Sequence, residues 1–257
     1  METLKKGSKG EDVKTLQRAL GITDDGDFGP GTEKAVKEFQ EKHNLVADGI
    51  VGNKTWEVLL SGQSDAVKID FQPINKHITK SKGREIKYLV IHFTAGTSSK
   101  KGNAIAARKV FLNRYASADF VVDDETIVQI NPEPKDYYCW AVGDGKGKYG
   151  VTNSNSIHIE VCSNLEKGTT TKAPNHEGWT FTEAAIDNTV KLSKLLIRKY
   201  NIPLDNVIRH YDASRKLCPG IIGWNPGVVY NSKTGAKTSA YSTEEKWKEF
   251  KSRLAEL

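Results

Sequence analysis

Three residues of this chain have the types and spacing of a metal centre. His210 and Cys218 lie eight positions apart, and His92 ends an apolar run far upstream. Two imidazoles and one thiolate form the ligand set of a catalytic zinc, which keeps a fourth position for water. The proline and glycine directly after Cys218 predict a turn that brings the thiolate back towards His210. Spacing alone leaves the alternative of a buried, inert cysteine near a surface histidine.

His92 follows the apolar run Tyr88–Ile91, which shows no polar alternation. Such a run predicts a strand that is covered on both faces. In open α/β sheets, ligands bind beyond the carboxyl ends of the strands, where His92 and Thr94 are expected. A histidine that caps a core strand is the alternative reading of His92.

Residues 156–162 predict a second strand. Period-two alternation places Ile157, Ile159 and Val161 on one face and puts His158 and Glu160 on the other. Glu160 is therefore a candidate proton carrier. The alternative for Glu160 is a solvated strand carboxylate, and for Lys216 it is a solvated loop charge.

Further strands are predicted over 119–122 and 126–130, and helices over 103–115, 182–200 and 242–257. Ser242 stands three residues before Glu245, the spacing of a capping box, which marks the start of the last helix. Strands interspersed with helices predict an α/β domain that has a central mixed sheet flanked by helices.

The first sixty residues contain an internal repeat. Asp25–Thr32 recurs as Asp48–Thr55, and each copy reads as an Asp-Gly turn, an apolar anchor, a second glycine and a helix start. Apolar residues at helical spacing around the repeat predict a small three-helix domain. We expect this domain over residues 1–62, a small polar linker over 63–71 and the α/β domain over 72–257.

The composition suits two globular domains: 257 residues are 37% hydrophobic and 27% charged. A net charge of +6 favours an anionic partner. Because the basic residues form no dense run, we do not expect that partner to be a nucleic acid. The 3 cysteines lie far apart without a CxxC motif, which argues against a disulfide framework and favours a reducing compartment.

The N-terminal residues lack the apolar stretch of a secretory signal, and no run approaches the roughly 20 apolar residues of a membrane span. We therefore expect cytoplasmic synthesis and no membrane insertion.

Residues 4–60 resemble the peptidoglycan-binding domain type 1 family. The resemblance rests on the two Asp-Gly units together with Gly7–Val13, Leu16, Gln17, Phe39, Gln40, Thr55 and Trp56. It implies binding to the glycan or peptide of the cell wall without catalysis.

Residues 72–225 resemble the zinc-dependent N-acetylmuramoyl-L-alanine amidases of the phage lysozyme and peptidoglycan recognition protein family. Four segments carry the resemblance in the family's order: 88–96, 118–123, 157–161 and 209–220. It implies that zinc is bound by His92, His210 and Cys218. It also implies that Glu160 acts as acid and base and that Lys216 stabilises the oxyanion.

Three further residues, Thr94, Trp140 and His158, are expected to contribute to substrate binding. Two positions depart from the family: Ala118 stands where some members have a tyrosine, and Ala141 where many have a histidine. No chemical role is expected of either alanine.

The resemblance implies hydrolysis of the amide between N-acetylmuramic acid and L-alanine by zinc-activated water. We expect a monomeric phage endolysin, made in the host cytoplasm without a signal peptide and then released to the peptidoglycan. The alternatives are a host autolysin or spore amidase, a non-catalytic peptidoglycan-binding or recognition protein, and a wall hydrolase that cuts another bond.

Overall fold

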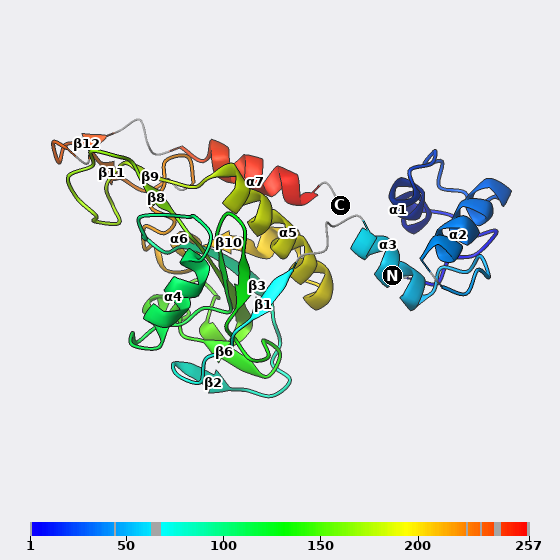
Figure 1. The fold of residues 1–257 in the computed structure, drawn as a ribbon, viewed down its shortest axis with the longest axis horizontal. Coiled ribbons are helices and arrows are strands. Elements are labelled where there is room, and N and C mark those ends of the chain that lie inside the picture. The colour runs from blue at the N-terminus through cyan, green and yellow to red at the C-terminus, as the bar shows by residue number, and fades with distance from the viewer. Residues whose placement is uncertain are drawn as a thin grey trace. The chain divides into compact units, whose positions relative to one another are not determined.

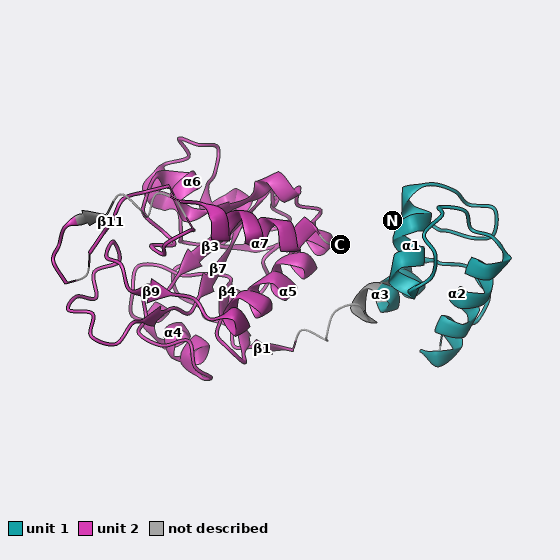
Figure 2. Ribbon diagram, turned by 90° about the horizontal axis from the view of Figure 1, so that it is seen from above, with its two compact units in different colours: residues 1–66 teal, residues 67–257 magenta. Residues whose placement is uncertain are grey.

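The computed structural model describes residues 2–43, 45–62, 68–224, 226–231, 233–238 and 243–255 (Figure 1). The chain forms two compact units, residues 1–66 and 67–257, which Figure 2 shows in two colours. No helix in the described ranges has the length and apolar character needed to cross a bilayer.

The N-terminal unit is helical in its described residues. Its helices are α1 (Glu11–Leu20), α2 (Pro30–Lys42) and α3 (Asn53–Gly62). They enclose one apolar core of Leu4, Val13, Leu16, Phe28, Val36, Val51, Trp56 and Leu59. Helix α1 ends at Gly21, whose left-handed conformation (φ 68°) suits glycine.

A buried glutamine closes the first Asp-Gly turn of this unit. The side-chain nitrogen of Gln17 lies 2.7 Å from Asp25 Oδ1 and 3.0 Å from Thr32 Oγ1. Its side-chain oxygen accepts a hydrogen bond of 2.8 Å from the backbone N–H of Gly26. Because Gly26 has a φ of +77°, the turn requires a residue without a Cβ.

Gln40 closes the second turn in the same way. Its side-chain nitrogen lies 3.0 Å from Asp48 Oδ1 and 3.2 Å from Thr55 Oγ1, and its oxygen accepts a bond of 2.9 Å from Gly49 N–H. The repeat that the sequence analysis identified is therefore a repeat of one polar structure, which we call the glutamine latch.

The second unit is built on a six-stranded mixed sheet, as predicted. In spatial order its strands are β1 (Ile69–Phe71), β5 (Ile127–Gln129), β4 (Phe120–Val122), β7 (Ser156–Val161), β3 (Tyr88–Phe93) and β10 (Val207–Arg209). The β4–β5 pair is antiparallel and every other pair in this sheet is parallel. The fold class thus agrees with the expectation.

The remaining elements form short ribbons and helices around the sheet. The ribbons are β2 (Ile78–Lys80) with β6 (Tyr137–Cys139), β8 (Asn164–Leu165) with β9 (Trp179–Thr180), and β11 (Val229–Tyr230) with β12 (Lys237–Thr238). The α-helices are α4 (Asn103–Phe111), α5 (Glu183–Tyr200), α6 (His210–Ser214) and α7 (Glu245–Ala255). The 3-10 helices among the described residues are η1 (Gly143–Gly145), η2 (Asn153–Asn155) and η3 (Leu204–Asn206).

The two faces of the sheet are covered differently. One face carries a continuous apolar core that includes Leu89, Ile91, Ile157 and Ile159, against which α5 and α7 pack (Figure 1). The opposite face has two smaller apolar clusters: one joins α4 to β4 and β5, and the other lies beside β3, β10 and α6. The polar residues of β3 and β7 occupy the region that these two clusters flank.

Three boundaries differ clearly from the expectation, and one of them is the end of α4, which stops at Phe111 although the helix was expected over 103–115. Residues 69–71, which were expected in the linker, form β1 and pair with β5, because an edge strand hydrogen-bonds its backbone even when its sequence looks polar. The last helix begins at Glu245, and the expected cap Ser242 lies outside the described residues.

Replacing Gln40 by leucine tests the glutamine latch. The substitution leaves the buried N–H of Gly49 without its acceptor, which costs about 1–3 kcal/mol. We expect the free energy of unfolding of the N-terminal unit to fall by that amount, measured by hydrogen exchange of its amides in the full chain. Glu38→Ala, on the exposed side of α2, is the control and should change it by about 0.5 kcal/mol or less. Equal effects of the two substitutions would contradict the latch.

Candidate metal centre and active site

His92, His210 and Cys218 converge in the second unit. Their ligand atoms all lie within 4.8 Å of one another, and the three residues are only 2%, 2% and 5% exposed. His92 Nδ1 is 3.8 Å from Cys218 Sγ. A tetrahedral zinc with ordinary Zn–S and Zn–N bonds holds such atoms about 3.6 Å apart. The donor types and their spacing therefore fit zinc.

The parallel pairing of β10 with β3 brings the two histidines together. Arg209 pairs with Ile91, so the next residues along the strands, His210 and His92, are adjacent, and their ring centroids are 4.6 Å apart. Arg209 also fixes the start of α6: Asp212 Oδ2 accepts hydrogen bonds from its backbone N–H (2.9 Å) and its Nε (2.8 Å).

The loop after α6 returns Cys218 to the histidines. The backbone N–H of Tyr211 donates a hydrogen bond of 3.0 Å to the carbonyl of Cys218, which closes the loop on the first turn of the helix. The structure thus shows the return of the thiol that the turn residues predicted.

Burial disfavours the protonated form of both imidazoles. It lowers the pKa of His92 well below the usual value, and a positive charge on His210, His158 or Lys216 would lower it further. Burial also lowers the pKa of His210, against the opposing effect of Asp144. Neutral imidazoles offer a lone pair to a metal. Burial raises the pKa of the Cys218 thiol, so its proton must leave when a metal binds.

Asp144 orients His210, and the sequence analysis missed it. Its Oδ1 lies 3.0 Å from His210 Nε2, which leaves Nδ1 as the ring nitrogen free for a metal. Asp144 belongs to η1, in a Gly-Asp-Gly stretch that matches no motif. Only the contact of η1 with α6 reveals its role.

Glu160 stands opposite His92 in the β3–β7 pair and lines the same cavity as the triad. Its Oε2 is buried and has no hydrogen-bond partner among the described residues. Burial raises the pKa of this carboxyl to about 8, while the positive charges of Lys216 and Arg114 oppose the rise. An unpartnered buried carboxyl oxygen that faces a cavity is the arrangement of a proton carrier.

Two exposed cations border this cavity. Lys216 lies in the loop between His210 and Cys218, and its charge acts on both His92 and Glu160. Arg114, in the turn after α4, also lines the cavity and acts on Glu160. Arg114 was not predicted as a site residue, because nothing in its local sequence distinguishes it from a surface charge.

Two hollows adjoin beside the triad and share Arg114, Ala116, Ala141 and Lys216 in their linings. The first, of about 360 Å³, contains the triad and Glu160 and is lined by Thr94 and by residues of α4. The second, a more open groove of about 560 Å³, is lined by Trp140, whose indole N–H donates to Thr79 Oγ1 (2.9 Å). Lys216 borders both hollows. The structure therefore places Thr94 and Trp140 where a substrate can reach them.

His158 is a correction to the expected substrate contacts. Its side chain is 0% exposed, and both ring nitrogens already have partners, His92 Nε2 at 3.2 Å and Ser156 Oγ at 3.1 Å. A fully buried ring with both nitrogens engaged is unavailable to a substrate.

Two alanines mark the departures from the family. Ala118 packs in the apolar cluster that joins α4 to β4 and β5, and Ala141 lines both hollows.

Removing a triad ligand should abolish tight zinc binding. We expect Cys218→Ser and His92→Ala each to weaken zinc binding by more than the roughly 100-fold that loss of an outer hydrogen-bond partner costs. Zinc per chain after dialysis against a chelator measures the effect. Cys139→Ala, which removes a buried thiol outside the triad, should keep the metal. Unchanged zinc content in both triad variants would refute the ligand set.

Comparisons with known proteins agree with this geometry. The family described as N-acetylmuramoyl-L-alanine amidase matches residues 82–221, and the one described as putative peptidoglycan binding domain matches residues 9–59.

Three relatives illustrate the similarity. The N-acetylmuramoyl-L-alanine amidase CwlH of Bacillus subtilis (strain 168) is 32% identical over 154 residues, 60% of this chain and 55% of CwlH. A spore cortex-lytic enzyme of Bacillus cereus is 39% identical over 88 residues, 32% of each chain. The solved structure of a mutant endolysin from Bacillus subtilis is 27% identical, covers 73% of this chain and 98% of its own, and gives a TM-score of 0.50.

The matched region spans 55% of CwlH and 32% of the spore cortex-lytic enzyme. The amidase match at residues 82–221 covers more than half of the 257 residues. The chain therefore belongs to the N-acetylmuramoyl-L-alanine amidase family.

Proposed function

We propose that this protein hydrolyses the amide between N-acetylmuramic acid and L-alanine in peptidoglycan, with zinc held by His92, His210 and Cys218. One observation carries the proposal: the buried triad and the unpartnered Oε2 of Glu160 line the same cavity. Membership in the amidase family supports the choice of bond.

An unactivated amide needs both a stronger electrophile and a stronger nucleophile. When bound, zinc polarises a carbonyl and lowers the pKa of water to about 7. Glu160 supplies the proton transfer: its Oε2 takes a proton from the attacking water and hands it to the departing amine nitrogen. General acid–base catalysis of this kind contributes about 10²- to 10⁴-fold.

Lys216 is the proposed partner of the negative oxygen that forms when water attacks the amide. It lines the same cavity as the triad and Glu160. A fixed cation at that place stabilises the developing charge. Arg114, which also lines the cavity, adds a second positive charge to the field at Glu160.

The two hollows suit a branched substrate. The scissile amide joins a peptide to a sugar strand, so the site needs two adjoining channels, one of which contains the metal ligands. We propose that Thr94, in the enclosed cavity, and Trp140, in the open groove, contact the substrate on either side of the amide. An exposed indole face is well suited to stack on a sugar ring.

The N-terminal unit is the proposed anchor on the insoluble substrate. We assign peptidoglycan binding to residues 1–62 and hydrolysis to the residues from β1 (Ile69–Phe71) onwards, since β1 belongs to the sheet that carries the site. Anchoring raises the local concentration of the hydrolytic site without adding contacts to it. The net charge of +6 favours an anionic wall.

A phage endolysin is the proposed biological role, acting as a monomer that is made in the host cytoplasm and released to the wall. The similarity to a mutant endolysin supports it. A host autolysin or spore amidase is the second candidate, which the similarity to a spore cortex-lytic enzyme favours. Cys218 argues against a non-catalytic recognition protein, since that thiol completes the zinc ligand set.

Digestion of purified cell walls tests the proposed bond. We expect the zinc-loaded protein to release new L-alanine amino groups and fragments that end at the lactyl group of muramic acid, identified by mass spectrometry. A cut elsewhere in the peptide or between sugars would replace the amidase by another wall hydrolase. Absence of any new ends would establish a binding protein.

Glu160→Gln tests the proton carrier. The amide keeps the shape of the side chain but cannot carry the proton, so we expect turnover to fall about 10²- to 10⁴-fold while zinc content stays unchanged. The release of L-alanine amino groups gives the rate. Glu166→Gln, at an exposed glutamate beyond the same strand, is the matched control and should keep full activity. Near-normal turnover of Glu160→Gln would exclude the assigned role.

A further inference from the structure

The buried ring of His158 lies in a chain of hydrogen bonds that begins at a backbone carbonyl and ends at the metal ligand His92. Ser156 Oγ donates to the carbonyl of Thr152, His158 Nε2 lies 3.1 Å from that Oγ, and His158 Nδ1 lies 3.2 Å from His92 Nε2. The amidase mechanism proposed above does not use His158. The donor and the acceptor of each hydrogen bond in this chain can be deduced in turn.

The carbonyl of Thr152 sets the direction of the first two links. A carbonyl oxygen can only accept, so the single hydroxyl proton of Ser156 points to it. Ser156 Oγ can then only accept from His158. It follows that His158 carries its proton on Nε2.

The next link transmits this direction to His92. The ring of His158 is 0% exposed, where a second, charged proton would be costly, so its Nδ1 has a free lone pair. His92 Nε2 must therefore donate to it. His92 Nδ1, which lies 3.8 Å from Cys218 Sγ, is left as the lone pair that faces the triad.

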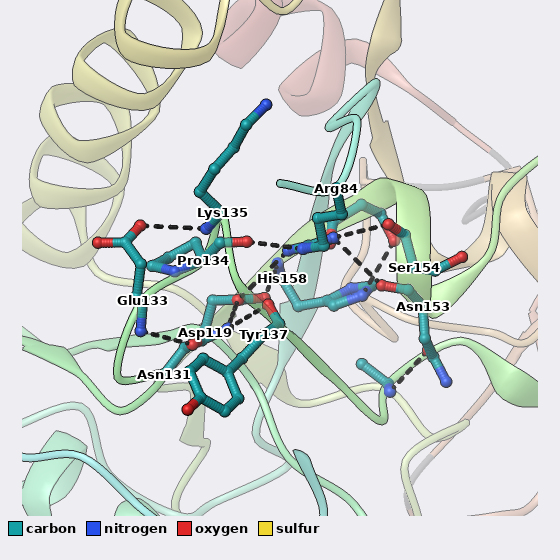
Figure 3. A network of polar contacts seen from close by, with 12 residues as sticks. Arg84, Asp119, Asn131, Glu133, Pro134, Lys135, Tyr137, Asn153, Ser154 and His158 are labelled. Atoms are coloured by element: carbon teal, nitrogen blue, oxygen red, sulfur yellow. Dashed lines mark hydrogen bonds and ion pairs between the residues drawn. The ribbon is translucent and has the colours of Figure 1, made fainter. Parts of the chain in front are cut away.

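A rigid polar frame holds the start of this chain. Asp119 and His158 lie side by side (Figure 3), and Asp119 Oδ2 accepts a bond of 2.7 Å from the backbone N–H of His158. Arg84 donates to the carbonyl of Ser156 at 2.9 Å. Arg84 also binds the carbonyls of Ser154 (3.1 Å) and Pro134 (2.6 Å). Asp119 and Arg84 are 0% and 6% exposed, so these contacts are shielded from water.

We propose that His158 is a positioning residue for the metal centre: the relay from Thr152 through Ser156 and His158 holds His92 in the Nε2-protonated tautomer and presents Nδ1 to zinc. This inference rests on the proposed zinc site and adds a residue that touches neither metal nor substrate. Partners of this kind fix the orientation of a ligating imidazole and strengthen metal binding.

The tautomer is measured first, in the metal-free full chain. Long-range ¹H–¹⁵N correlation spectra of the histidine rings distinguish a protonated nitrogen from a bare one, and the His92→Gln variant assigns the His92 ring. We expect wild-type His92 to be protonated on Nε2 alone. A His92 protonated on Nδ1 would overturn the proposal without any reference to activity.

Zinc affinity, measured by competition with a chelator, is the second readout. We expect His158→Leu to mix the His92 tautomers and to weaken zinc binding by about 10- to 100-fold. His158→Gln should restore most of the affinity, because its amide can accept from His92 and donate to Ser156. Ser156→Ala should loosen the relay, whereas Ser193→Ala, the same change at a buried serine of α5, should leave zinc affinity unchanged.

A folded His158→Leu protein with wild-type affinity and tautomer would refute the relay. If that variant does not fold, Ser156→Ala decides by the same two readouts. Failure of the proposed function would give a different result. If the wild-type protein shows the single tautomer and binds zinc but cuts no peptidoglycan, the proposed amidase activity is refuted and the relay is not.

Discussion

The parallel pairing of β3 with β7 is the constraint on which the site depends. It sets His92 opposite Glu160 and Val90 opposite His158, so that one face of two neighbouring strands carries a metal ligand, a carboxyl group and a supporting ring. A shift of one residue in this pairing would turn the polar set of one strand into the apolar core beneath α5. The leucines and isoleucines that alternate with these residues are buried in the core, and their burial therefore fixes the register that positions the polar side chains.

The polar face of the sheet is covered by two separate apolar clusters, which explains how many polar groups can be buried between them. Two separate apolar clusters flank the region, and neither fills it. Buried polar atoms are costly unless they have partners, and here nearly every nitrogen of the three central histidines has one. The free carboxyl oxygen of Glu160 is an exception, and it faces the cavity. The unpaired atom is thus found where a reaction can use it.

Much of this arrangement is predictable from the chain alone, and the reason is periodicity. The unbroken apolar run before His92 and the strict alternation around Glu160 locate both residues on strands, and Pro219 with Gly220 indicates the returning loop. Asp144 and Arg114 escape such reasoning, because each acts from a loop whose place is decided by distant contacts. His158 was assigned to the correct face but to the wrong partner. Period-two alternation predicts which face of the sheet a side chain occupies, but it does not predict which residue of another strand the side chain contacts.

The two units differ in how far along the chain their key contacts reach. Each glutamine latch closes over at most 15 residues, from Gln17 to Thr32 and from Gln40 to Thr55. The metal site joins His92 to Cys218 across 126 residues. Local contacts form fast and domains fold in the order of synthesis, so the N-terminal unit can be complete on the ribosome while the triad still lacks two members. A nascent or truncated chain that ends before Cys218 would therefore carry a folded N-terminal unit without a complete metal site.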